Sequence, residues 1–507
     1  MDILANLALG FSVALSPDAL FICLVGVTLG TLIGILPGIG PIAGISLLLP
    51  LTFHLGPTEA IIMLAGMYYG AQYGGSTASI LLNLPGTASS SVTCLDGYPM
   101  SRNGRGGAAL FLTTISSFVG GTFAILLMVV FSPTLARLAL QFGSTEYAAM
   151  MVLGLLAAAT LSTSGPIKGV AMVALGLLIG LIGADPETGL PRFTFGQLNL
   201  LDGINIVIVA MGLFGVSEVL VNLMRPEVRI TDPKAYSMGA MMPTREEARR
   251  SIMPTGRGSL IGAFVGLLPG AGAILASFMA YAFERRVSKT PEKFGTGMVE
   301  GVTSVEAANN SAAQAAFIPT MTLGIPGSSV MALMLGALMI HGITPGPMVI
   351  VNQPELFWGL IASFFIGNVM LLILNLPMIG LWLKILMVPR AYLFPGILFF
   401  VCMGTYGLRN SPFDVGLVML FGLLGYGLRY LHYPLAPLIL GFILGPLLEE
   451  HVRRAMLLSG GDATVFVTRP LSGTIFAICI GLLAYAIFSE IRRTRATRPK
   501  REIGSGT

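Results

Sequence analysis

The sequence predicts an all-α polytopic membrane protein built from two inverted structural repeats. Of its 507 residues, 54% are apolar and only 10% are charged, and the mean hydropathy is +0.83. A soluble domain carries about 25% charged residues, so this chain lacks the polar surface that contact with water would require. Several apolar runs are long enough to cross about 30 Å of hydrocarbon. They are residues 107–132, 147–163, 204–223, 355–376 and 471–489.

A glycine motif occurs twice at a constant offset and divides the chain into two halves. Residues 26–40 read GVTLGTLIGILPGIG and residues 258–272 read GSLIGAFVGLLPGAG, so both follow the pattern G-x3-G-x3-G-x2-P-G-x-G. A second shared motif follows each copy, NLPGTASS at 83–90 and GIPGSSVM at 324–331. Two motifs that recur in the same order predict two related halves.

Each half is expected to contain one hairpin and one broken helix. Glycine at every fourth position lets another backbone approach that helix face closely, and Pro-Gly breaks the helix at its end. Broken backbone at membrane depth is tolerated only inside protein or beside a watery cavity, so matched breaks indicate a transporter's binding site. The expected elements are a first repeat at 1–225 (hairpin 17–54, broken helix 59–95), a basic cytoplasmic linker at 226–257, a second repeat at 258–490 (hairpin 258–283, broken helix 301–342) and a basic tail at 491–507, with further transmembrane helices completing each repeat.

Loop charge orients the two hairpins, because Lys and Arg concentrate in cytoplasmic loops. The flanks of the first hairpin are not basic, whereas both flanks of the second hairpin are basic. We therefore expect the first hairpin to enter the membrane from outside and the second from inside, with Pro37-Gly38 and Pro269-Gly270 as their tips. The basic tail places the C-terminus in the cytoplasm.

One loop conflicts with this topology. Arg453, Arg454 and Arg469 fall in residues 449–470, which the alternation of segments places outside. The preceding segment, 433–448, is short and contains three prolines. The sequence therefore leaves the topology of 433–470 open.

The second broken helix carries a polar face beside its break. Glu306, Asn309, Asn310 and Gln314 lie at i, i+3, i+4 and i+8, on one side of a helix. Placing the carboxylate in lipid would be costly, so we expect this face to point into the bundle. Oxygen-rich side chains and freed carbonyls suit a hard cation such as Na⁺, although an interhelical hydrogen-bond cluster would use the same residues. The predicted ion-binding residues are Gly38, Gly40, Asn83, Gly270, Gly272, Glu306, Asn309 and Asn310.

Hydroxyl-bearing residues surround the breaks at Pro85-Gly86 and Pro326-Gly327. A helix that starts after Pro-Gly presents unpaired N–H groups and the positive end of its dipole to an anion. The alternative is that the hydroxyl groups only cap these helices. The predicted carboxylate-binding residues are Pro85, Gly86, Thr87, Ser89, Pro326, Gly327, Ser328 and Ser329.

Other classes of function find little support in the sequence. The four cysteines lack metal or redox spacing, and neither HExxH nor G-x-S-x-G occurs, so no catalytic residues are expected. The net charge of +5 comes from a few loops and the tail, and it does not indicate nucleic-acid binding. A channel is an alternative, but matched breaks in two repeats favour alternating access.

Five segments carry a resemblance to a known family. They read GTLIGILPGIGP, YGGSTASILLNLPGTASSSVTCLDGYPMSRNGRGGAAL, GADPETGLPRFTFG, EAANNSAAQAAFIPTMTLGIPGS and PLAPLILGFILGPLLEEHVRRAML. In these segments and in their order, over about residues 10–470, the chain resembles the large membrane subunit (TctA family) of the tripartite tricarboxylate transporters.

The resemblance implies uptake of citrate or related carboxylates across a bacterial inner membrane. The driving force would be an ion gradient, with Na⁺ or H⁺ as the coupling ion and no other cofactor. The resemblance also implies two partners, a small four-helix membrane subunit and a periplasmic solute-binding protein that delivers the carboxylate. An ordinary single-component carboxylate carrier or a channel is the alternative, and an intramembrane enzyme is a weaker one. The sequence does not determine which carboxylate is carried.

Cysteine accessibility tests the two hairpins. In a variant that lacks the native cysteines, Ser16→Cys and His54→Cys should react with an impermeant maleimide added to the outside of the membrane. Arg257→Cys and Lys289→Cys should react only from the cytoplasmic side, because both flanks of a re-entrant hairpin share one side. Labelling of the two flanks of either hairpin from opposite sides would reject the re-entrant arrangement.

Overall fold

A computed structural model of the chain describes residues 3–36, 39–139, 141–160, 165–185, 187–223, 241–268, 272–385 and 390–496. Most of these residues are helical, and six helical stretches among them are long and apolar enough to cross a membrane. They are Pro17–Ile35, Thr93–Arg137, Ile206–Leu223, Pro354–Asn375, Pro412–Tyr430 and Leu435–Leu458. The prediction of an all-α polytopic membrane protein is therefore confirmed, while the inverted relation of the repeats stays a prediction.

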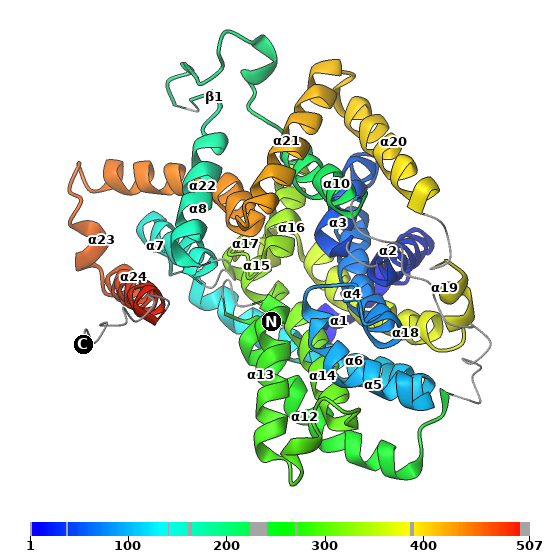
Figure 1. The fold of residues 1–507 in the computed structure, drawn as a ribbon. Coiled ribbons are helices and arrows are strands. Elements are labelled where there is room, and N and C mark those ends of the chain that lie inside the picture. The colour runs from blue at the N-terminus through cyan, green and yellow to red at the C-terminus, as the bar shows by residue number, and fades with distance from the viewer. Residues whose placement is uncertain are drawn as a thin grey trace, which may run out of the picture.

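The elements of the first half run from blue to green in Figure 1. They are α1 (Ile3–Ala14), α2 (Pro17–Ile35), α3 (Gly40–Thr52), α4 (Pro57–Leu82), η1 (Ser89–Ser91), α5 (Thr93–Met100), η2 (Ser101–Arg105), α6 (Gly106–Ala139), α7 (Ser144–Thr160), α8 (Pro166–Gly180), the antiparallel strands β1 (Gly183–Ala184) and β2 (Pro191–Arg192), η3 (Leu198–Leu200), α9 (Ile206–Ala210), η4 (Met211–Val216) and α10 (Ser217–Leu223).

The elements of the second half run from green to red in Figure 1. They are α12 (Arg245–Gly266), α13 (Gly272–Val287), η6 (Pro291–Lys293), α14 (Val299–Ala315), α15 (Phe317–Leu323), α16 (Ser329–Ile340), α17 (Met348–Asn352), α18 (Pro354–Asn375), α19 (Ile379–Ile385), α20 (Arg390–Arg409), α21 (Pro412–Tyr430), α22 (Leu435–Leu458), α23 (Val465–Thr468) and α24 (Pro470–Ala496).

Each copy of the glycine motif lies at the junction of two helices, α2 with α3 and α12 with α13. Gly40 and Gly272 start the second helix of each pair with φ values of 69° and 60°, in the left-handed region that favours glycine. The last glycine of each copy therefore has the same backbone conformation. The predicted tips, Pro37-Gly38 and Pro269-Gly270, lie outside the described residues.

Helix α12 begins at Arg245 rather than at the predicted hairpin start of 258, so it includes part of the predicted linker. The cause is a capping box. The Thr244 hydroxyl accepts a hydrogen bond from the Glu247 N–H at 3.2 Å, and the Glu247 carboxylate accepts one from the Thr244 N–H at 2.7 Å. Such a reciprocal cap satisfies two backbone donors at a helix start. Residues 226–240 of the linker lie outside the described part of the chain.

The glycine stripes bring two pairs of helices into backbone contact. A Cβ added to Gly30 of α2 would lie 2.4 Å from the carbonyl oxygen of Met67 on α4. A Cβ added to Gly262 of α12 would lie 2.3 Å from the carbonyl oxygen of Ala308 on α14. The full stripes are Gly26, Gly30 and Gly34 against Met63, Met67 and Ala71, and Gly258, Gly262 and Gly266 against Ser304, Ala308 and Ala312. The same packing therefore occurs once in each half.

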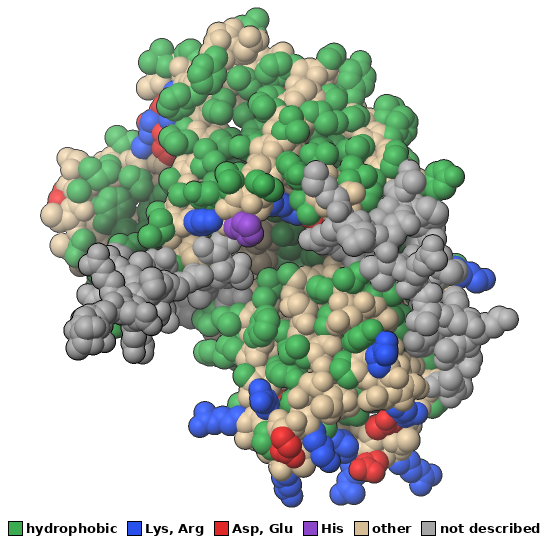
Figure 2. All heavy atoms as spheres, in the orientation of Figure 1, with side chains coloured by type: hydrophobic (Ala, Val, Ile, Leu, Met, Phe, Trp, Pro, Cys, Tyr) green, Lys and Arg blue, Asp and Glu red, His purple; other side chains and the backbone are tan. Residues whose placement is uncertain are grey.

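Ion pairs join the segments that loop charge places in the cytoplasm. Arg105 pairs with Glu247, Arg250 with Glu300, and Arg257 with Glu284. Figure 2 shows Lys and Arg side chains gathered at this end of the molecule, over α12 and α13. Segments that are distant in the sequence but predicted for one side of the membrane thus lie together.

The arginines that conflict with the predicted topology also have acidic partners. Arg453 pairs with Asp185 and Glu187 in the connection between α8 and α9, and Arg469 pairs with Glu146 at the start of α7. All three acidic partners belong to segments that the alternation of helices places outside. The structure therefore groups the loop 449–470 with other predicted outside segments, and acids balance its positive charge locally.

The glycine contacts give a stability prediction. Gly258→Ala should lower the free energy of unfolding by about 1–3 kcal/mol, because its Cβ would lie 2.2 Å from the carbonyl oxygen of Ser304. Gly256→Ala on the same helix is the matched control, since no atom lies within 4 Å of its added Cβ. Thermal unfolding in detergent, followed by tryptophan fluorescence, measures both. Equal midpoints for the two variants would show that the close contact at Gly258 does not stabilise the fold.

Candidate functional site

The first break in the chain follows α4. Asn83 ends this helix in the left-handed conformation, with φ 55°. After Pro85-Gly86 the chain enters η1 and then α5. Gly86 is buried against the backbone at the end of α2, where an added Cβ would lie 1.9 Å from the carbonyl oxygen of Gly34. Only glycine fits this position, so the break depends on its contact with the first hairpin.

The second break has the same construction. Gly324 ends α15 in the left-handed conformation, with φ 70°, and α16 begins after Pro326-Gly327. The Cβ of a residue at 327 would lie 3.5 Å from the carbonyl oxygen of Gly266, at the end of α12. Gly34 and Gly266 are equivalent positions of the glycine motif, so each break lies against the first helix of the hairpin in its own half.

Each hairpin also contacts the broken helix of the other half. Helix α13 touches η1, and α3 touches α16. Gly272, at the start of α13, lies close to Ser328, because its added Cβ would be 3.9 Å from the Ser328 Cβ. The structure thus brings together the predicted positions Gly272 and Ser328, and it places elements of both halves around both breaks.

Glu306 is fully buried in the middle of α14 and connects the two halves. Its carboxylate accepts hydrogen bonds from the Thr93 hydroxyl on α5 and, at 3.4 Å, from the Asn309 side-chain amide. No Lys, Arg or His side chain pairs with it among the described residues. When it is ionised, a buried carboxylate with only neutral partners has no positive charge to balance it.

Unpaired oxygen atoms cluster on the same helix. Asn310 donates to the Ser117 hydroxyl of α6 at 2.7 Å, but its Oδ1 has no hydrogen-bond donor. The buried oxygens of α14 without a donor are Ser304 Oγ, Asn309 Oδ1, Asn310 Oδ1 and Gln314 Oε1. Buried polar atoms are almost always paired, so four unpaired acceptors on one helix indicate an additional bound donor or cation.

The hydroxyl groups around the first break mostly satisfy one another. Ser89 donates to Gln72 Oε1 at 2.9 Å, Thr87 and Ser89 lie 3.0 Å apart, and Ser79 donates to the Ser90 carbonyl oxygen at 2.9 Å. Thr87 Oγ1 also accepts from the Ser90 N–H at 3.4 Å, which is a helix cap. In this structure the cluster fixes the conformation of the break.

The remaining predicted residues differ in exposure. Asn83 and Pro85 are exposed, whereas Pro326 and Gly327 are buried. Ser328 caps α16 by accepting from the Met331 N–H at 3.3 Å, and Ser329 is half-buried beside it. No hydrogen bond joins Asn83 to Asn309 or Asn310 among the described residues, so the structure does not bring these predicted ion ligands into direct contact. Gly38 and Gly270 lie outside the described part.

Two polar contacts near this site are difficult to predict from the sequence. Tyr73 of α4 donates to Asn368 Oδ1 on α18 at 2.5 Å, and the Asn368 amide donates to Thr122 on α6 at 2.9 Å. An Asn inside the apolar run 355–376 is a detectable signal, because a polar side chain in a transmembrane helix needs a partner. Its partners are too distant in the sequence to be identified from it.

Asp96 forms a second connection between the halves. One carboxylate oxygen accepts from the N–H groups of Gly295, Gly297 and Met298 at 2.8–2.9 Å, and the other accepts from the Tyr281 hydroxyl at 2.9 Å. These contacts fix the first turn of α5, which follows the first break, to α13 and to the segment before α14. They position the second hairpin relative to the first broken helix.

Together these features define a class of protein. A multi-pass helical bundle, with two broken helices of matching construction and a buried polar face between its halves, has the architecture of a membrane transporter. A family model described as "Tripartite tricarboxylate transporter TctA family" matches residues 20–440. The chain therefore belongs to the TctA family, the large-subunit family of a transporter that works with partner subunits, and the predicted resemblance is confirmed.

Two curated relatives come from Agrobacterium vitis, and both are described as uncharacterized. The "52.8 kDa protein in TAR-I ttuC' 3'region" is 50% identical over 495 residues, which cover 98% of each chain. The "protein in TAR-II ttuC' 3'region" is 53% identical over 234 residues, which cover 46% of this chain and 97% of the relative. No solved structure matches the chain.

Proposed function

We propose that this chain is the large permease subunit of a secondary active, cation-coupled transporter that imports tricarboxylates or related carboxylate anions by alternating access. It would act in a bacterial inner membrane with a cytoplasmic C-terminus. The observation that carries the coupling to a cation is the environment of Glu306. Its carboxylate is fully buried and has only Thr93 and Asn309 as hydrogen-bond partners.

Charge balance requires a positive partner for this carboxylate when it is ionised. An uncompensated charge in a low-dielectric interior is too costly to persist, so the group must take up either a proton or a cation. A proton would neutralise Glu306 alone and would leave the oxygens of Asn309, Asn310 and Gln314 without partners. A hard cation coordinates both carboxylate and amide oxygens, which favours Na⁺ as the coupling ion.

The carboxylate substrate is proposed to lie beside the breaks, where the second hairpin meets them. Helix α16 begins at Ser329 after the Ser328 cap, and its free N–H groups and dipole favour an anion. The hydroxyl groups of Thr87 and Ser89 lie on the other break, which contacts α13 through η1. Substrate binding would require Thr87 and Ser89 to exchange their present hydrogen bonds for contacts with the anion.

Two partners complete the proposed transporter, a small four-helix membrane subunit and a periplasmic solute-binding protein. The word "tripartite" in the family description supports three components in general. The small subunit would cover part of the exposed apolar surface of the helices, and lipid would cover the rest. The binding protein would deliver the carboxylate from outside.

Ion dependence tests the proposed cation site. Asn310→Ala should raise the Na⁺ concentration for half-maximal uptake roughly tenfold, because one oxygen ligand is lost. Asn309→Ala and Asn83→Ala should shift it in the same direction. Asn375→Ala is the matched control, since Asn375 is buried on α18 and also has an unpaired Oδ1, but lies on a different helix. The ion dependence is measured in proteoliposomes at a series of Na⁺ gradients. If Asn310→Ala, Asn309→Ala and Asn83→Ala all transport with the wild-type ion dependence, the cation binds elsewhere.

Reconstitution tests the dependence on partners. Vesicles that contain this chain alone should take up little carboxylate, because a separate binding protein is proposed to deliver it. Adding the small subunit and a carboxylate-loaded binding protein should raise the uptake rate at least about tenfold. Full-rate uptake by the isolated chain would instead identify an ordinary carrier. Uptake that needs no ion gradient would identify a channel.

A further inference from the structure

The connection between α8 and α9 forms a small ordered unit outside the helical bundle. Strands β1 and β2 pair antiparallel, with Gly183 opposite Arg192, and η3 follows them. In Figure 1 this unit projects from the end of the molecule opposite α12 and α13. Those helices carry the Lys and Arg side chains of the predicted cytoplasmic end, so this unit is predicted to lie outside the membrane.

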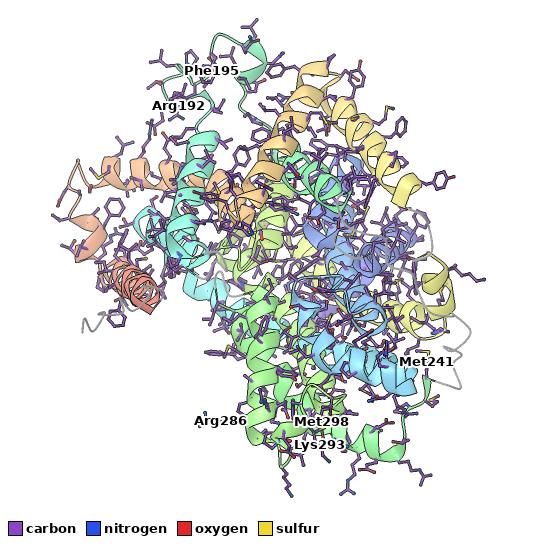
Figure 3. All side chains as sticks on the ribbon, viewed as in Figure 1. Arg192, Phe195, Met241, Arg286, Lys293 and Met298 are labelled. Carbon is purple, nitrogen blue, oxygen red and sulfur yellow. The ribbon has the colours of Figure 1, made fainter. Side chains whose placement is uncertain are left out.

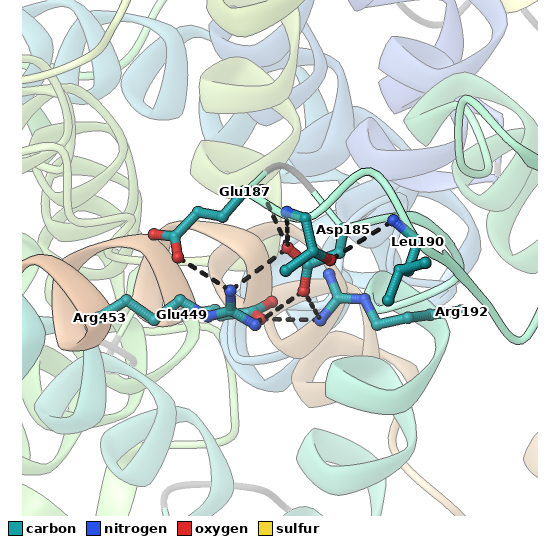
Figure 4. A network of polar contacts seen from close by, with 7 residues as sticks. Asp185, Glu187, Leu190, Arg192, Glu449 and Arg453 are labelled. Carbon is teal, nitrogen blue, oxygen red and sulfur yellow. Dashed lines mark hydrogen bonds and ion pairs between the residues drawn. The ribbon is translucent and has the colours of Figure 1, made fainter.

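A charged network fixes the base of this unit to α22 (Figure 4). Asp185 pairs with Arg453 at 2.8 Å, and Glu449 pairs with both Arg453 at 2.7 Å and Arg192 at 2.8 Å. Asp185 also accepts hydrogen bonds from the N–H groups of Glu187 and Thr188. The Arg453 guanidinium and these N–H groups hold the pKa of Asp185 well below its usual range. The Asp185 carboxylate therefore stays ionised at physiological pH, and its ion pairs hold the base against α22.

Four apolar side chains extend from this rigid base into solvent. We name them the apolar tip, and they are Leu190 (65% exposed), Phe193 (54%), Phe195 (84%) and Leu198 (80%). Phe193 and Phe195 both have φ values of 51°, a left-handed conformation that bulky residues rarely adopt. Strained backbone at exposed aromatic residues contributes nothing to the stability of the fold, and such strain is typical of sites that bind a partner.

The charged base separates the apolar tip from the hydrocarbon. Figure 3 shows Phe195 farther from the helical bundle than Arg192, and at the opposite end of the molecule from Arg286 and Lys293. The carboxylates and guanidinium groups at the base must lie in water or among headgroups, because burying them in lipid is costly. A tip on the far side of that charged layer is out of reach of the acyl chains. The tip is therefore placed to meet a water-soluble protein rather than lipid.

We propose that the apolar tip is the docking site for the soluble solute-binding protein on the outer face of the transporter. This assignment rests on the proposed function, which supplies a binding protein on that side of the membrane. Phe193 and Phe195 would insert into an apolar pocket on the partner, as rigid aromatic anchors do in protein interfaces. The ion-paired base keeps the anchors ordered before the partner arrives, which lowers the entropy lost on docking.

Binding measured on the intact protein tests the proposal. The chain and its small subunit are placed in lipid nanodiscs, and the probe is the carboxylate-loaded binding protein that stimulates uptake by wild-type vesicles. The double variant Phe193→Ser/Phe195→Ser should weaken its Kd at least about thirtyfold. Phe195→Leu, which keeps an apolar side chain, should weaken it much less. Leu458→Ser is the matched control, because Leu458 is 80% exposed at the end of α22 but outside the tip, and it should leave the Kd unchanged.

Uptake assays show whether the double variant has lost docking or lost its fold. A raised concentration of binding protein should restore the uptake rate of the double variant to the wild-type value. An unchanged Kd, with stimulation of uptake preserved, would overturn the docking site while the proposed function stands. Wild-type vesicles that no binding protein stimulates would overturn the proposed function itself.

Two further outcomes would assign the tip to other occupants and reject the proposal. Phe195→Trp introduces a fluorescent probe at the tip, and quenching of its fluorescence by brominated lipids would place the tip in the bilayer. A change in oligomeric state in the double variant would make the tip a contact between two copies of the chain. We expect no quenching and an unchanged oligomeric state.

Discussion

The rest of the site depends on one interaction, the close backbone contact of the glycine stripes of α2 and α12 with their neighbours α4 and α14. Lipid offers no hydrogen-bond partners, so a helix can break inside a membrane only where protein surrounds the break. The stripe of α2 lies on α4 and ends at Gly34, whose carbonyl oxygen faces Gly86 at the first break. The stripe of α12 lies on α14 and ends at Gly266, which faces Gly327 at the second break. In each half, the glycine stripe thus joins the hairpin to the broken helix and helps to enclose the break.

Enclosure also decides what the polar face of α14 can do. Because the glycine contacts exclude solvent from one side of α14, and α6 covers another through Asn310 and Ser117, the Glu306 carboxylate is left with neutral partners only. In such a low-dielectric environment an ion interacts far more strongly than in water. Because of this enclosure, the unpaired amide oxygens would favour the proposed cation, whereas the same oxygens on an exposed helix would simply be hydrated.

The sequence predicts the fold class and the polar faces well, because both depend on local periodicity. Glycines at every fourth position, the polar face at Glu306 and Asn310, and the apolar runs are all visible within a single window of sequence. Helix α12 begins at Arg245, before the predicted hairpin start at 258, and the capping pattern of Thr244 and Glu247 is visible in the sequence. The partners of Glu306 and Asn368 cannot be identified from the sequence. Thr93 lies 213 residues from Glu306, and Tyr73 lies 295 residues from Asn368. Such pairings follow from the packing of the two halves, which no local pattern contains.

The exchange of contacts between the halves would give the proposed cation a physical route to the second hairpin. Glu306 of the second half bonds Thr93, which follows the first break, while Asp96 on the same short helix accepts hydrogen bonds from Tyr281 and from the segment before α14. A cation that withdraws the Glu306 carboxylate from Thr93 would therefore act on a helix that also anchors the second hairpin. Coupling between sites requires that one element be biased by both ligands. Helix α5 meets that requirement, since it follows the break where the carboxylate is proposed to bind and contacts the residue proposed to bind the cation.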